Sequence, residues 1–153
     1  ITEGLVGSEM CIRDREYAAS ERGQKKNQLF YWGNDLLVND KYMCNTWNSG
    51  YPNTIGFQDG FKYTSPIGHF EANSLGIFDM AGNVWEWCYN WHLPYEGNSE
   101  IFPTDLKGKA QRGGSFLCNS NYCHGFRLSA RSATSPESSL FHVGFRCVKN
   151  ITN

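Results

Sequence analysis

Long apolar patterns of helical period are scarce in this chain, and this scarcity constrains its fold more than any other feature. The apolar content lies largely in aromatic residues, with five Trp, eight Tyr and ten Phe, and sixteen Gly are spread among them. Glycine interrupts regular elements, whereas aromatic side chains bury a large area per residue. The combination predicts a loop-rich fold with short strands and an aromatic core.

Size and charge narrow the class of protein further. A length of 153 residues suits one domain, and no internal repeat or domain boundary is visible. The net charge of −1 does not provide a broad basic surface, so no nucleic-acid partner is expected. No apolar run approaches the length of a membrane span. We expect a monomer without a membrane-spanning segment.

Local patterns predict a few short elements. Short strands are expected at 29–32, 115–117, 126–130 and 143–148, where apolar residues cluster or alternate. Residues 45–68 are rich in Asn, Gly, Pro and Tyr, which favours a long ordered loop over a helix. Such a loop must satisfy its backbone polar groups, and bound cations are one way to do so.

The first fifteen residues, ITEGLVGSEMCIRDR, differ in character from the rest. They lack the apolar core and small-residue cleavage site of a secretory signal. Part of the stretch resembles translated sequencing-adapter read-through, so residues 1–15 are interpreted as a non-native leader and set aside from the fold. A disordered natural leader is the alternative. Residues 16–149 are then one N-terminally truncated domain, followed by a tail at 150–153, and a prokaryotic cytoplasm or periplasm is the expected compartment.

Cys118 and Cys123 are the main candidates for chemistry. Four residues separate them, and they follow the Gly113-Gly114 pair. Two such thiols can close a disulfide, share a structural metal or hold a soft metal ion for redox work. Zinc would need two further ligands with their own spacing, and His124 is the only one nearby. Cu(I) accepts two thiolates alone, but the spacing leaves a structural disulfide equally open.

Four motifs surround this pair in a fixed order: G-N-V-W-E-W at 82–87, R-G-G-S at 112–115, F-R-L-S-A-R at 126–131 and V-G-F-R-C at 143–147. Together they resemble the C-terminal half of a formylglycine-generating enzyme, also called sulfatase-modifying factor. The likeness runs from residue 16 to residue 148. Most relatives of other function lack the cysteine pair, which makes it the discriminating feature. The resemblance implies an α+β, loop-rich fold of the formylglycine-generating-enzyme or C-type-lectin-like kind.

The resemblance also implies an activity. Enzymes of this family use O₂ and Cu(I) to oxidise a Cys within a C-x-P-x-R segment of an unfolded sulfatase polypeptide to Cα-formylglycine. By this likeness Cys118 and Cys123 are the copper ligands. The catalytic set is completed by further residues, namely Ser115, Tyr122, Trp85 and Arg131. Ser115 can also be read as a turn serine and Trp85 as a core residue, and Arg127 and Arg146 are expected to form structural ion pairs.

Two groups of oxygen donors match the structural calcium sites of the resembled family. The first group is Asn45, Thr46, Asp59 and Phe61. The second group is Asp79, Gly82, Val84 and Glu86. Calcium accepts carboxylates, side-chain amides and backbone carbonyls together, as these residues would provide. Without the resemblance, these Asn and Asp residues would be interpreted first as ordinary turn residues.

Two other classes of function stay open. The chain can be a non-catalytic member of the same fold that binds a peptide or partner, with Cys118 and Cys123 as a disulfide. It can also be a relative that forms sulfur–carbon bonds with iron, although its four His residues show no ligand spacing. Asn119 stands where animal members of the resembled family commonly have His, and Asn cannot transfer protons as His does.

Overall fold

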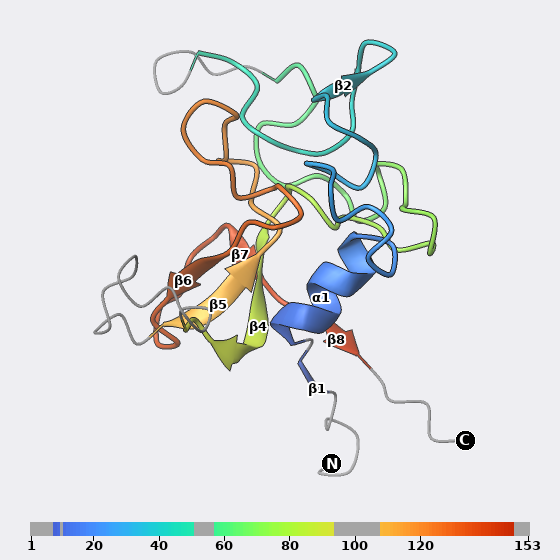
Figure 1. Cartoon of the computed structure of the whole chain (residues 1–153). Coiled ribbons are helices and arrows are strands. Elements are labelled where there is room, and N and C mark those ends of the chain that lie inside the picture. Colours follow the sequence, from blue (N-terminus) through green and yellow to red (C-terminus); the bar gives the residue numbers. More distant parts are fainter. Residues whose placement is uncertain (1–7, 10, 51–56, 94–107, 149–153) are drawn as a thin grey trace.

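A computed structural model describes residues 8–9, 11–50, 57–93 and 108–148 (Figure 1). Within these ranges the chain forms one helix, α1 (Ile12–Ala19), and eight short strands. The strands are β1 (Ser8–Glu9), β2 (Leu37–Val38), β3 (Lys41–Tyr42), β4 (Trp85–Trp91), β5 (Lys109–Arg112), β6 (Ser132–Thr134), β7 (Val143–Gly144) and β8 (Cys147–Val148). Loops make up most of the remainder, so the predicted loop-rich α+β class is confirmed. Among the described residues, no helix is long and apolar enough to cross a bilayer.

The four-stranded sheet has the order β6-β5-β4-β7. β4 pairs antiparallel with β5 and parallel with β7, and an irregularity in its pairing with β5 falls between Trp87 and Trp91. The helix α1 packs against β4 and β5, while β2 lies in the loop-rich part away from the sheet (Figure 1). The start of β4, at Trp85, therefore marks the junction between the sheet and the loops.

The helix α1 begins within the segment that the sequence analysis set aside from the fold. Cys11 is its N-cap, and its Sγ accepts a hydrogen bond from the backbone N–H of Asp14. Ile12 and Arg15 are buried, and β1 pairs with β8. Residues 11–15 thus pack within the domain, which corrects the view that all of residues 1–15 stand outside the fold. The leader's origin and the boundary at residue 16 stay predictions.

The core is aromatic, as the composition predicted. Phe30, Tyr31, Trp85 and Phe126 are buried in one cluster with smaller apolar residues. The rings of Phe30 and Phe126 stack with centroids 5.4 Å apart. This stacking and the hydrogen bond from the N–H of Leu128 to the carbonyl of Leu29 at 2.8 Å together join two loop segments that share no sheet.

Three of the strand predictions need correction. Residues 29–32 are a turn closed by a bridge between Phe30 and Gly33, although Phe30 and Tyr31 are buried as expected. Segments 115–117 and 126–130 are also turns, because hydrogen bonds within each turn and to the distant carbonyls of Asn83 and Leu29 satisfy their backbone groups without a sheet ladder. The stretch 143–148 forms two strands, β7 and β8, with Phe145 and Arg146 between them. The long loop is confirmed at 45–50 and 57–68, while 51–56 lie outside the described residues.

Candidate functional site

Cys118 and Cys123 lie side by side at the two ends of a tight turn. Their Sγ atoms are 2.6 Å apart, and neither forms a disulfide. Cys118 is 2% exposed and Cys123 is half-buried. The N–H of Cys118 donates to the carbonyl of Ser115 at 2.9 Å, and the N–H of Cys123 donates to that of Asn119 at 2.8 Å. The structure therefore brings together the two thiols that the sequence analysis selected.

The contact between the two thiols shifts their pKa values in opposite directions. The hydrogen bond between the two thiols is the main cause that raises the pKa of Cys118, and burial is the second. The same hydrogen bond lowers the pKa of Cys123 to about 6, against the effect of burial. The contact therefore favours the thiolate at Cys123 and the protonated thiol at Cys118. A thiolate is the form of cysteine that binds soft metal ions, so this donor set fits a soft cation.

Trp85, the first residue of β4, lies against the thiol turn. Gly125 makes this approach possible, because a Cβ there would be 2.3 Å from Cη2 of Trp85 and 3.2 Å from Sγ of Cys123. The indole belongs to the same buried cluster as Cys118. The N–H of Trp85 donates to the carbonyl of His142 at 2.8 Å, which fixes its backbone. Trp85 is thus both a core residue and a neighbour of the thiols.

The other three predicted catalytic residues have different surroundings. Ser115 is fully buried next to Cys118, and its Oγ accepts a hydrogen bond from the N–H of Leu117 at 3.2 Å. Tyr122 is 73% exposed on the turn. Arg131 immediately precedes β6. Burial, and secondly the charge of Arg131, lower the pKa of His92. Of these three residues, only Ser115 lies beside the thiols. The catalytic roles of Ser115, Tyr122 and Arg131 stay predictions.

The first two residues of the G-N-V-W-E-W motif tie the surrounding loops together. Gly82 and Asn83 adopt positive φ angles of 71° and 64°, which glycine and asparagine tolerate best. The N–H of Gly82 donates to the carbonyl of Gly113 at 2.7 Å, and that of Asn83 donates to the carbonyl of Asn45 at 2.9 Å. Phe116 in turn donates to the carbonyl of Asn83 at 2.8 Å. Through these hydrogen bonds, the motif connects the loop that contains Asn45 with the loop that leads to Cys118.

The first predicted calcium set comes together in the structure. Asp59 accepts hydrogen bonds from the N–H groups of Thr46 and Phe61 at 2.9 and 3.1 Å. Asn45 is buried, its Nδ2 donates to the carbonyl of Tyr63 at 2.7 Å, and its Oδ1 has no hydrogen-bond partner among the described residues. Buried oxygens that lack a partner are rare, so a cation fits this donor set. In the described ranges no cluster of three or more His, Cys, Asp or Glu forms, and this set contains only one carboxylate.

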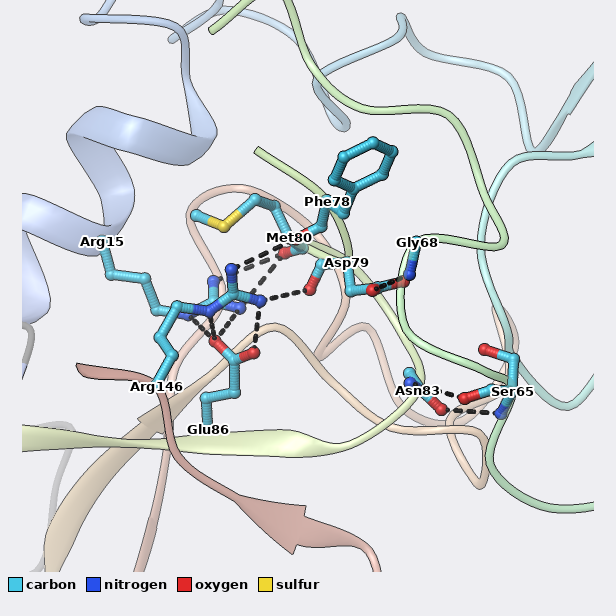
Figure 2. A network of polar contacts seen from close by, with 9 residues as sticks. All are labelled: Arg15, Ser65, Gly68, Phe78, Asp79, Met80, Asn83, Glu86 and Arg146. Atoms are coloured by element: carbon cyan, nitrogen blue, oxygen red, sulfur yellow. Dashed lines mark hydrogen bonds and ion pairs between the residues drawn. The ribbon is translucent and has the colours of Figure 1, made fainter. Parts of the chain in front are cut away.

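The residues of the second predicted calcium set all line one pocket of about 450 Å³. The carboxylate of Glu86, however, is occupied by two arginines (Figure 2). Nε of Arg15 and Nε of Arg146 donate to its Oε2 at 2.9 and 2.8 Å. Arg146 also donates to the backbone carbonyl of Asp79 at 3.1 Å, and the Asp79 carboxylate accepts from the N–H of Gly68 at 2.8 Å. In this arrangement a cation would compete with two guanidinium groups, and the second site stays a prediction.

Sequence reasoning found part of this polar network. The structural ion pair expected for Arg146 is confirmed. Burial would raise the pKa of Glu86, but the charges of Arg15 and Arg146 outweigh it and lower the pKa. Arg15 was missed because it lay in the segment that was set aside. The only signal was its spacing from Ile12, which places both on one face of a helix that packs against β4.

The comparisons agree with this fold and these motifs. A family model described as a sulfatase-modifying factor enzyme 1-like domain matches residues 11–151. The chain therefore belongs to the sulfatase-modifying factor family.

The proteins that this chain resembles carry different names. The "Formylglycine-generating enzyme" of Mus musculus is 37% identical over 138 residues, which cover 88% of this chain and 37% of that protein. The "Inactive C-alpha-formylglycine-generating enzyme 2" of Bos taurus is 30% identical over 137 residues, covering 88% and 42%. The solved structure of PvdO from Pseudomonas aeruginosa has a TM-score of 0.66 and 26% identity, covering 90% of this chain and 50% of that one. The chain thus spans half or less of the length of these proteins.

Proposed function

We propose that this chain carries the thiol site of a copper-dependent oxidase that converts a Cys in a C-x-P-x-R segment of a sulfatase to Cα-formylglycine. The observation that carries the proposal is the pair of unoxidised thiols, 2.6 Å apart beside Trp85, in a chain of the sulfatase-modifying factor family. Bound Cu(I) would supply the one-electron chemistry toward O₂ that ordinary side chains lack.

The protein's own residues have distinct tasks in this proposal. Cys118 is anchored in the core by the turn from Ser115 and serves as the fixed ligand. Cys123 is the more accessible thiol, so a substrate thiol would approach the pair from its side. Trp85 excludes water from one side of the pair and, through its packing on Gly125, limits the movement of Cys123. Both thiols must lose their protons to bind, so copper affinity should fall as the pH drops.

The test is mass spectrometry of a synthetic C-x-P-x-R peptide incubated in air with the Cu(I)-loaded chain. We expect conversion of the peptide Cys to an aldehyde by the parent protein and no conversion by the Cys123→Ser variant. Cys44→Ser is the matched control, because Cys44 is buried in the same core cluster but has no place in the thiol pair. A folded parent protein that binds no copper and converts no peptide would refute the proposal.

A second candidate function is a non-catalytic peptide- or partner-binding member of the family. The direct contact of the two thiols and the relative named as inactive favour it. In this case the pair would close as a disulfide, and the protein would not retain copper under mild chelation. Copper retention by the reduced chain therefore separates the two candidates, independently of any peptide assay.

We also propose a structural Ca²⁺ at Asn45, Thr46, Asp59 and Phe61, supported by the unpartnered Oδ1 of Asn45. Chelation of calcium should lower the thermal midpoint, because a ligand that binds only the folded state adds about 2.7 kcal/mol at a concentration of 100 Kd. The Asp59→Asn variant should have a low midpoint that no longer responds to calcium. Asp40→Asn, an exposed change in the neighbouring loop, should respond as the parent does. An identical midpoint of the parent with calcium and with chelator would contradict the site.

A further inference from the structure

We propose that Asn119 is a positioning residue that fixes the spacing of the two thiols by tying their turn to the loop at 47–49. The inference goes deeper into the proposed function, since it takes Cys118 and Cys123 as a pair that binds one soft ion. It does not depend on which ion that is. By the family resemblance, Asn119 stands where animal members commonly have His, and that resemblance assigns no role to the Asn side chain.

The side chain of Asn119 is fully engaged with backbone groups. It is 5% exposed. Its Nδ2 donates to the carbonyls of Trp47 and Ser49 at 2.8 and 3.2 Å, and its Oδ1 accepts from the N–H of Asn121 at 2.9 Å. Two donors and one acceptor on a single short side chain therefore connect the thiol turn with a loop more than sixty residues away in the sequence.

The backbone of the same residue closes the turn. The carbonyl of Asn119 accepts from the N–H groups of Tyr122 and Cys123 at 3.1 and 2.8 Å. On the other side, the N–H of Trp47 donates to the carbonyl of Cys118 at 2.8 Å. The Cys118–Asn119 peptide is thus held from two directions, so the position of Asn119 sets how closely Cys123 returns to Cys118.

The contacts of Asn119 border a pocket of about 360 Å³. Its lining includes Asn119, Ser120 and Asn121 on one side and Trp47, Asn48 and Ser49 on the other. Once the Asn119 amide is removed, water in this pocket can reach the carbonyls of Trp47 and Ser49. A buried group that can bond to water is not left unsatisfied. We therefore expect Asn119→Ala to fold, with its backbone hydrogen bonds in place, while the turn loses its side-chain attachment to the loop at 47–49.

The first measurement of the test probes the thiol pair without copper. A trivalent arsenical such as phenylarsine oxide binds tightly only where two thiols can reach one arsenic atom. In Asn119→Ala we expect arsenical affinity and Cu(I) affinity, the latter by competition with a chromogenic chelator, to fall by about 10- to 100-fold, as for other residues that orient metal ligands. Alkylation of the half-buried Cys123 by iodoacetamide, which needs no pairing, should continue, and this contrast separates lost spacing from general loosening.

Two further variants make the test decisive. Asn121→Ala is the matched control, because the described hydrogen bond of Asn121 to Asn119 comes from its backbone N–H, and it should bind the arsenical as the parent does. Asn119→Asp keeps the shape and the Oδ1 acceptor but places a carboxylate oxygen against two carbonyls, so it should show the same loss as the Ala variant. Unchanged arsenical affinity in folded Asn119 variants would overturn the proposal. Failure of both variants to fold would also overturn it, since Asn119 would then serve the fold and not the spacing.

The outcome is separable from the proposed function. A parent protein that binds the arsenical but oxidises no peptide would remove the oxidase proposal and leave the role of Asn119 standing. Retained peptide oxidation by an Asn119 variant with weakened arsenical binding would show instead that thiol spacing does not limit the reaction.

Discussion

Replacing Glu86 by Gln is expected to lower the free energy of unfolding by about 3–5 kcal/mol, the range for breaking one partner of a buried ion pair. Glu86 and Arg15 are both buried, and the carboxylate is bonded to Arg15 and Arg146 together (Figure 2). Glutamine keeps the size and one acceptor but leaves the Arg15 charge without its counter-ion. Denaturant unfolding of parent and variant at neutral pH measures the difference.

The pH dependence gives an independent check on Glu86. Because its pKa is lowered in the folded state, its charge stabilises the fold above the ordinary carboxyl pKa, and this contribution is lost as the pH falls through the lowered value. The gap between parent and Glu86→Gln should therefore narrow on acidification. Glu137→Gln, an exposed change, should remain within about 0.5 kcal/mol of the parent. A Glu86→Gln variant as stable as this control would show that the network is dispensable.

Gly82→Ala is expected to cost about 3 kcal/mol or more, because strain and overpacking act together. At φ 71° an added Cβ would be strained, and it would also lie 2.3 Å from the carbonyl oxygen of Asn45. That oxygen belongs to the backbone and accepts the hydrogen bond of Asn83, so it cannot move away without breaking the junction. Thermal or denaturant unfolding measures the loss, and calcium response measures whether the Asn45 loop is disturbed.

Gly76→Ala is the matched control for Gly82. Its φ of 74° is nearly the same, but an added Cβ would meet nothing within 4 Å. The control should therefore show backbone strain alone, about 1–2 kcal/mol. Equal losses in the two variants would mean that the close approach to Asn45 contributes nothing to stability.

The thiol site could be predicted from the sequence because its two cysteines are close together along the chain. Cys118 and Cys123 are separated by four residues and follow Gly113-Gly114, so one turn suffices to bring them into contact. The role of Trp85 was recognisable only in part, because its approach depends on Gly125, a distant residue with no side chain to signal the contact.

Strand assignments at 115–117 and 126–130 failed for the opposite reason. Apolar residues such as Phe116, Phe126 and Leu128 are buried as their type predicts, but they are buried from turns. Hydrogen bonds within these turns, together with those to the carbonyls of Asn83 and Leu29, satisfy the polar groups that a ladder would otherwise need. Burial can be predicted from residue type, whereas the local conformation that achieves it depends on which partners are available.

By itself the sequence determined the family, the aromatic and loop-rich character of the core, and the pair of thiols. These follow from composition and from motifs whose members are near one another. Only the tertiary structure decided that Glu86 is paired with Arg15 and Arg146, and that Asn119 docks the thiol turn on the loop at 47–49. These contacts join residues about sixty or seventy positions apart. No local pattern encodes them, because a hydrogen-bond donor or charge has many possible partners until the packed core selects one.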